Sequence, residues 1–419
     1  MLDFKSMNNI INDKIMTFFK NLPVFAHVET TRSCQFIAWI FSIVAVSVVV
    51  GFIPFPVSLY YLPICSICLL YILLGGVKKV NGMYVALFVA FGLSALFAEE
   101  PIFNSKVRWG LFVMVSLLCS PCISSERAVT FRTLITRNIL TLLTLLTVGS
   151  FFCYFLGVNY MRTTANELHD LSSAGIFGGL YSHSMLLGPC SVLVAMIFLN
   201  SFMVERKKLY ILLFFISAAT VVLSASRAST FALGVPIVYS LFFVKDGGSS
   251  RKNLIGLLLV ALILGAPMAE KISGGLMEKQ QRNIEMGGTL SSREGKWDAR
   301  IKEFQEHPIT GIGFCAVDTK NTGDYNSYGG VEPGSTHLSV LSMTGILGLI
   351  PYVMVLLAAY KAVRRDESAK AKIRMCLFLV MITHATFEGY GLYAGGFLFL
   401  MFWLMIGQCE DYNIMKSMV

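Results

Sequence analysis

Residues 338–360, LSVLSMTGILGLIPYVMVLLAAY, form an uncharged apolar run that decides the class of fold. A helix needs roughly 20 apolar residues to cross the hydrocarbon core of a bilayer, and this run is long enough. Its composition is typical of the whole chain, in which 55% of the residues are hydrophobic and 14% are charged. A soluble globular protein carries about 25% charged residues, so the sequence predicts a polytopic membrane protein.

Further apolar runs along the chain predict an all-α protein with about twelve transmembrane helices. Helices rather than barrel strands are expected, because the runs are continuous and lipid offers the backbone no hydrogen-bond partners. No repeat and no change of composition divides the chain, so residues 1–419 are expected to form a single membrane domain. The predicted spans lie near 35–52, 57–74, 83–97, 109–123, 139–156, 185–202, 209–224, 229–244, 254–267, 338–360, 373–387 and 390–409.

The distribution of the 34 lysines and arginines predicts how these spans are oriented. With a cytoplasmic N-terminus, 22 of them lie on the cytoplasmic side and 12 outside, and eight of the 12 belong to the polar stretch 268–336. Long loops count little in the positive-inside rule, so the lysines and arginines of the short loops decide the orientation. Their excess on one side predicts that both termini are cytoplasmic. Residues 268–336, between the ninth and tenth spans, then form a loop with short helices that faces the periplasm of a bacterial inner membrane. The net charge of +9 indicates topology and contact with anionic membrane lipid, not nucleic-acid binding.

The polar loop contains the signals of one helix. Ser291 and Glu294 form a capping box that predicts a helix start, and His307-Pro308 predicts its end. Trp297, Ile301 and Phe304 recur on one face and predict an apolar stripe. Ser292 and Arg293 lie in the first turn, where exposed amides, a hydroxyl and a guanidinium together make a candidate anion site.

Two more polar groups lie at predicted outer ends of spans. Arg227 lies in the short connection between the seventh and eighth spans, and its planar guanidinium suits two phosphate oxygens. His337 follows Ser335 and Thr336, either of which can cap the tenth span. The helix dipole disfavours an imidazolium in a first turn, so His337 is a candidate proton acceptor. The alternative for an arginine at a helix end is a side chain that reaches to lipid headgroups.

Three stretches, mostly in the second half of the chain, resemble the O-antigen ligase and polysaccharide polymerase superfamily of bacterial envelopes. They are Ser226-Arg227-Ala228-Ser229, then Ser292-Arg293 with Trp297 and His307-Pro308-Ile309-Thr310-Gly311-Ile312-Gly313, then Ser335 to Gly348, which ends Leu341-Ser342-Met343-Thr344-Gly345-Ile346-Leu347-Gly348. The predicted topology agrees with that family, with twelve spans, both termini inside and a large outer loop before the tenth.

The resemblance implies a GT-C-like glycosyltransferase without metal or other cofactor. Such an enzyme moves a glycan from undecaprenyl diphosphate to a sugar hydroxyl at the periplasmic face. The departing diphosphate needs cationic stabilisation, a role that fits Arg227 and Arg293, and the acceptor hydroxyl needs a base, a role that fits His337. The chain departs from the ligase pattern because its histidine lies three residues closer to Gly345 and Gly348. Glu332 is therefore a rival base.

The Glu-Pro-Gly-Ser opening at 332–335 favours a polymerase of lipid-linked repeat units, with an O-antigen ligase as the alternative. A lipid-linked sugar transporter is disfavoured, because the charges gather at one outer face and no inverted repeat is evident. Expected partners are an undecaprenyl-diphosphate-linked glycan, membrane lipid and, as a candidate, a chain-length regulator. Residues expected to contact substrate are Arg227, Arg293, Ser292, Arg300, Ser335, His183 and Glu388.

Overall fold

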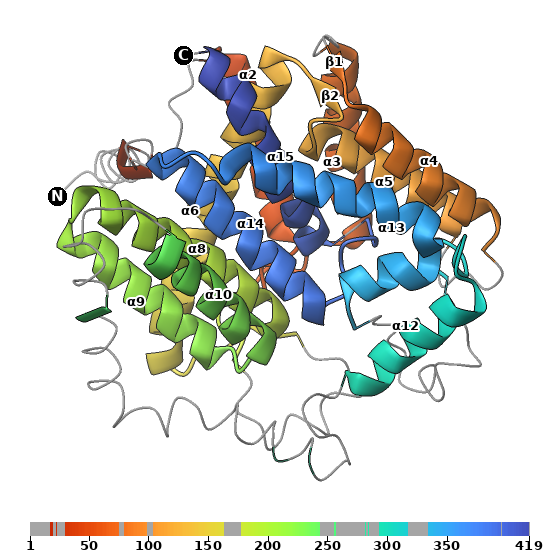
Figure 1. Ribbon diagram of the computed structural model, residues 1–419. Helices are drawn as coiled ribbons and strands as arrows, with labels where there is room; N and C mark the ends of the chain where they lie inside the picture. The colour runs from red at the N-terminus through yellow and green to blue at the C-terminus, as the bar shows by residue number, and fades with distance from the viewer. Residues whose placement is uncertain are drawn as a thin grey trace.

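The computed structural model shows a helical protein, as the all-α prediction expected (Figure 1). It describes residues 17–19, 22, 30–74, 79–98, 104–162, 177–243, 255–256, 281, 284, 293–316, 334–394 and 396–418. Within these residues the strands are a two-residue pair, β1 (Lys79–Val80) and β2 (Ile123–Ser124), which run antiparallel. The described fold is therefore a bundle of helices, and almost all of its packing is helix against helix.

The helices coincide with the predicted spans along most of the chain. In chain order they are α2 (Arg32–Ser47), α3 (Val57–Leu74), α4 (Gly82–Leu96), α5 (Ser105–Cys119), α6 (Glu126–Phe155), α8 (Ser184–Glu205), α9 (Lys208–Leu223), α10 (Arg227–Phe243), α12 (Glu294–Glu306), α13 (Thr336–Val363), α14 (Ala369–Phe387) and α15 (Phe397–Met418). The predicted ninth span, 254–267, lies outside the described residues apart from two positions.

The lengths of the helices and the apolar side chains on the surface are those of a membrane protein. In the described part of the chain, α6, α8 and α13 are long and apolar enough to cross a bilayer, and several shorter helices are also apolar. Phe36, Leu62 and Leu73 are 66–71% exposed, which suits side chains that face lipid. α8 lies at the centre, where every residue from Leu187 to Ser201 is buried. The number of membrane crossings stays a prediction.

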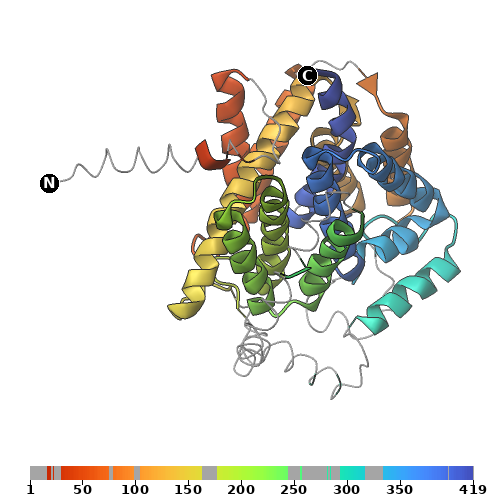
Figure 2. The ribbon, with the colours of Figure 1, turned by 60° about the vertical axis from the view of Figure 1, so that its left-hand side comes forward.

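Neighbouring helices alternate in direction between two ends of the bundle. α10 and α14 are antiparallel, because Phe231 contacts Phe387 near one end and Ser240 approaches Cys376 toward the other. We call the end that holds Arg227, Thr336 and Phe387 the mouth. The opposite end, which holds Arg132 and Asp411, is the far end. α10 begins at the mouth and ends toward the far end, whereas α12 lies at the mouth (Figures 1 and 2).

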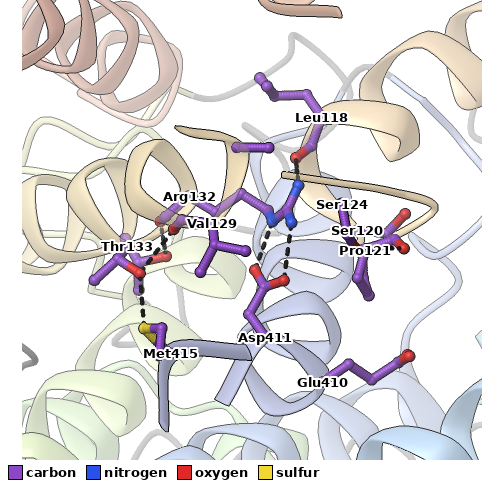
Figure 3. A network of polar contacts seen from close by, with 12 residues as sticks. Leu118, Ser120, Pro121, Ser124, Val129, Arg132, Thr133, Glu410, Asp411 and Met415 are labelled. Atoms are coloured by element: carbon purple, nitrogen blue, oxygen red, sulfur yellow. Dashed lines mark hydrogen bonds and ion pairs between the residues drawn. The ribbon is translucent and has the colours of Figure 1, made fainter. Parts of the chain in front are cut away.

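A buried ion pair at the far end explains why two helices exceed their predicted spans. α6 begins at Glu126 rather than near 139, and α15 continues past 409 to Met418. Arg132, expected in a cytoplasmic loop, is instead buried within α6. Its Nε and Nη2 donate to the two carboxylate oxygens of Asp411 at 2.6 and 2.8 Å, and its Nη1 donates to the carbonyl of Leu118 (Figure 3). The bidentate pair lets two charged residues lie inside packed helices.

α13 is interrupted at Gly345, whose φ of 59° and ψ of −161° lie outside the helical region. Residues 308–313 of the predicted His307–Gly313 motif lie against the interruption and supply the hydrogen bonds that the helix loses there. Four backbone bonds of 2.9–3.1 Å do this, from Ile346 N to Pro308 O, Leu347 N to Ile309 O, Ile312 N to Ser342 O and Gly313 N to Met343 O. α13 thus consists of a short half, 336–344, and a long half, 346–363.

Gly345→Ala is expected to lower the free energy of unfolding by about 1–3 kcal/mol, because alanine disfavours a positive φ. A Cβ at this position would also overlap the carbonyl of Ile309, so the figure counts the backbone alone. Thermal unfolding in detergent measures the change. Gly234→Ala, at a position with open space around the Cβ, is the matched control and should not destabilise. Equal stability of Gly345→Ala and the wild type would show that the interruption does not depend on this glycine.

Candidate active site

α12 is the helix predicted in the polar stretch, but it begins later than the capping pattern indicated. Its N-cap is Arg293, which makes no side-chain cap bond, whereas Ser291 and Ser292 lie outside the described residues. His307 is the C-cap, as predicted. Ile301, in the predicted apolar stripe, is 41% exposed, and the helix buries other side chains. The buried residues are Ala299, Arg300 and Glu303.

Arg293 ties α12 to the start of α13 and the end of α14. Its Nη2 lies 2.5 Å from a carboxylate oxygen of Glu388, and its Nη1 lies 3.5 Å from the carbonyl oxygen of Gly334. Trp297 Nε1 donates to the same carbonyl at 3.1 Å. Because Gly334 has a φ of +76° and a Cβ there would meet Lys296, only glycine fits this close approach without strain. The first turn of α12 is thus fixed against the chain just before α13.

Glu388 is held in place by its own backbone. Its carbonyl accepts hydrogen bonds from the Thr336 amide at 3.0 Å and the Thr336 hydroxyl at 2.7 Å. The Thr336 hydroxyl in turn accepts from the amide of Gly391, whose carbonyl accepts from Trp403 Nε1. Glu388 is 7% exposed, so its carboxylate interacts with Arg293 with little screening by water. These bonds join three helices around one carboxylate at the mouth.

Arg227 reaches the same place from a distant part of the sequence. It is the first residue of α10, and the positive charge of Arg293 lies close enough to act on its guanidinium. A row of aromatic rings connects α10 to α12. The ring centroid of Phe387, at the end of α14, lies 5.5 Å from that of Phe231 and 6.0 Å from that of Trp297. Among the described residues, the mouth therefore places the guanidiniums of Arg227 and Arg293 near one another and near the Glu388 carboxylate.

The remaining predicted residues divide between the mouth and other places. His183 is the N-cap of α8 and accepts from the Met185 amide through Nδ1 at 3.1 Å. A Cβ at Gly188 would overlap Ser229, so the first turns of α8 and α10 lie side by side. Ser335 is the N-cap of α13, as predicted, and its hydroxyl accepts from Leu338 N. Glu332 and Ser292 lie outside the described residues.

His337 fastens the two halves of α13 together. Its Nδ1 lies 2.8 Å from the Tyr352 hydroxyl oxygen, and its Nε2 lies 3.1 Å from the carbonyl oxygen of Ile382. In a straight helix, residues 337 and 352 would lie about 22 Å apart along the axis, so these contacts require the chain to fold back at Gly345. A carbonyl can only accept, so Nε2 carries the proton and Nδ1 of the neutral ring accepts from Tyr352. This arrangement favours a structural role for His337 over its predicted role as a base.

His337→Ala is expected to lower the free energy of unfolding by about 1–3 kcal/mol, because it leaves the buried Tyr352 hydroxyl without its partner and removes one hydrogen bond to the Ile382 carbonyl. Turnover per folded molecule should stay within a few-fold of the wild type. Glu332→Gln should instead lose about 100-fold or more if Glu332 is the base. Denaturation curves and single-turnover rates of both variants separate the two roles. A well-folded but inactive His337→Ala protein, with full activity in Glu332→Gln, would reverse the assignment.

Arg300 lies apart from Arg293, although both belong to α12. It lies seven residues further along α12, about 10 Å along the helix axis, and pairs with Glu303 at 2.6 Å. Among the described residues, no cluster of histidine, cysteine, aspartate and glutamate is arranged to hold a metal ion.

The geometry thus defines a helical membrane protein with a cationic site at one end of its bundle. Residues 212–353 match the family model described as O-antigen ligase. The matched segment runs from α9 to the long half of α13 and contains Arg227, Arg293 and the interruption at Gly345. The resemblance to the O-antigen ligase and polymerase superfamily is confirmed over this part of the chain. A search of the curated proteins finds no match.

Proposed function

We propose that the protein is a membrane glycosyltransferase that polymerises undecaprenyl-diphosphate-linked oligosaccharide repeat units at the periplasmic face of the inner membrane. The observation that carries the proposal is the proximity of Arg227 and Arg293, 66 positions apart in the sequence, on helices whose first turns both pack against Phe387. Both arginines lie within the segment that matches the O-antigen ligase family. Two cations in a partly buried site suit an anionic leaving group better than a neutral substrate.

The two arginines would act on the leaving group. An acceptor sugar hydroxyl attacks the anomeric carbon of the donor glycan, the bond from that carbon to the diphosphate oxygen breaks, and undecaprenyl diphosphate leaves with the electron pair. Arg227 and Arg293 stabilise the charge that develops on the diphosphate. Glu388 orients Arg293 through their 2.5 Å contact and reduces its repulsion with Arg227 before substrate binds. The hydroxyl proton passes to a base.

We assign the base to Glu332 rather than His337. Both ring nitrogens of His337 are engaged by Tyr352 and Ile382. Glu332 precedes Gly334 by two residues, a separation of at most about 7 Å along an extended chain, and Gly334 contacts Arg293 and Trp297. A carboxylate tethered this close to the mouth is a suitable proton acceptor.

An O-antigen ligase is the second candidate, because the matched family carries that description. Both enzymes would use the same donor and leaving group, and they differ in the acceptor. Purified protein given only undecaprenyl-diphosphate-linked repeat units should produce a ladder of longer glycans if it is a polymerase. A product that forms only after lipid A core is added would identify a ligase. Absence of transfer under both conditions, with the fold intact, would contradict the shared proposal.

A further inference from the structure

The buried face of α12 carries an ion pair whose hydrogen bonds are incomplete. Arg300 is 3% exposed and Glu303 is fully buried, and their side chains meet at 2.6 Å. Arg300 Nε and Nη1 are buried and have no hydrogen-bond partner among the described residues. A buried charged donor without a partner is costly, and such groups in native proteins commonly serve a ligand. The stability of α12 alone does not account for this arginine.

Other polar side chains surround this pair. The charges of Arg300, Glu303 and Arg108 all act on the hydroxyl of Tyr393, which lies in the connection between α14 and α15. Burial raises the pKa of this hydroxyl well above its usual value, so it is a neutral donor. Arg108, on the first turn of α5, donates to the Tyr61 hydroxyl at 3.1 Å. Among the described residues, this cluster holds two arginines and one glutamate.

The position of the cluster relative to the mouth suggests what it binds. α12 lies across one end of the bundle, with its first turn toward α10 and α14 and its other end toward α4 and α5 (Figures 1 and 2). The chain that leaves α12 confirms this direction, because a Cβ at Gly313 would overlap Ala98 just after α4. The two cationic sites therefore lie at the start and in the middle of one helix, at the same end of the bundle. Phosphate groups of two lipids in one leaflet would also lie at similar depth.

We propose that Arg300 and Arg108, with the Tyr393 hydroxyl, form a second anion-binding site for the diphosphate of a lipid-linked acceptor. This inference rests on the proposed polymerase function, in which donor and acceptor both carry a diphosphate. The donor diphosphate departs at Arg227 and Arg293, whereas the acceptor diphosphate takes no part in bond breaking. The second site therefore contributes to acceptor binding and not to the chemical step, so its loss changes the acceptor KM more than kcat.

A single-transfer assay can separate the two lipids. The donor is a repeat unit on undecaprenyl diphosphate whose acceptor hydroxyl is blocked, so that it can only donate. One acceptor carries a phosphonate-linked diphosphate lipid that cannot leave, and the other carries the same oligosaccharide on a neutral lipid alcohol. Wild-type protein should bind the charged acceptor about 10- to 100-fold better, the factor expected for charge-assisted hydrogen bonds.

The test variant is the double substitution Arg300→Met with Glu303→Leu, which removes the pair without leaving a buried charge. It should abolish the preference for the charged acceptor and leave the donor KM unchanged. Arg300→Lys, which keeps the charge, should retain part of the preference. Lys302→Met, on the exposed face of α12, is the control and should behave as wild type.

Three outcomes would overturn the second site: no preference in the wild type, an unchanged preference in the double variant, or an equal loss with both acceptors. A raised donor KM would place Arg300 in the donor site instead. None of these results would affect the proposed function, which fails separately if Arg227→Ala and Arg293→Ala proteins transfer glycan at the wild-type rate.

Discussion

Arg293→Ala is expected to lower the rate of glycan transfer by purified protein about 100- to 1,000-fold. Loss of one preorganised donor to a developing negative charge costs roughly this factor in other enzymes. The expectation follows from the position of Arg293, whose guanidinium is fixed by Glu388 and Gly334 beside Arg227. Release of undecaprenyl diphosphate in a single-turnover assay measures the effect. Arg227→Ala should show a loss of the same order.

Two further variants separate catalysis from folding at this position. Removal of Arg293 leaves the Glu388 carboxylate buried, so Arg293→Ala combined with Glu388→Gln should restore the stability of the fold but not the activity. Arg293→Lys should retain only part of the rate, because an ammonium lacks the planar fork that binds two phosphate oxygens. Lys302→Ala on the exposed face of the same helix is the control. Wild-type turnover in a well-folded Arg293→Ala protein would remove the diphosphate-binding role.

Arg132→Ala or Asp411→Ala is expected to lower the free energy of unfolding by about 3–5 kcal/mol, because either change leaves an unpaired charge inside the bundle. Both side chains are at most 1% exposed, and they join α6 to α15 through two hydrogen bonds (Figure 3). Replacement of both residues, as Arg132→Met with Asp411→Leu, should recover most of the stability. Denaturation in detergent micelles measures the three proteins side by side.

The far end also provides a control for this prediction. Lys207 and Glu205 form an ion pair in which the lysine side chain is 61% exposed, so Lys207→Ala should leave the unfolding transition unchanged. Transfer activity of the Arg132→Met with Asp411→Leu protein should equal that of the wild type, because the pair lies at the opposite end from the mouth. If Arg132→Ala and Lys207→Ala had the same small effect, burial of the pair would not contribute to stability.

The helices were predictable wherever an apolar run filled a whole span, as in α8 and α9. The predictions were wrong where a charge lies inside a helix, since hydropathy along the sequence gives no information on partners distant in the chain. Arg132 is predicted to lie in a cytoplasmic loop, because hydropathy does not show that Asp411, 279 positions away, neutralises its charge. The interruption of α13 has a local signal in Gly345, but the segment that completes its hydrogen bonds, 308–313, does not adjoin it in sequence.

The candidate site was predictable in its residue types and less so in its geometry. Arg227 and Arg293 were selected because a guanidinium at a helix start suits phosphate, and the structure brings them together. Arg300 was grouped with them by sequence proximity, whereas two helical turns separate it from Arg293. The first-turn position of His337 predicts a base, but no local pattern indicates that the fold-back at Gly345 places Tyr352 against its ring. Glu388 is predicted only to contact substrate, and its contact with Arg293 makes it a central residue of the mouth.

The most direct test of the central claim is the position of bound undecaprenyl diphosphate in a cryo-EM structure of the protein in lipid nanodiscs. The account predicts density for the diphosphate at the mouth, within hydrogen-bonding distance of both the Arg227 and Arg293 guanidiniums. Diphosphate bound elsewhere on the protein, with these two side chains turned away from it, would contradict the account.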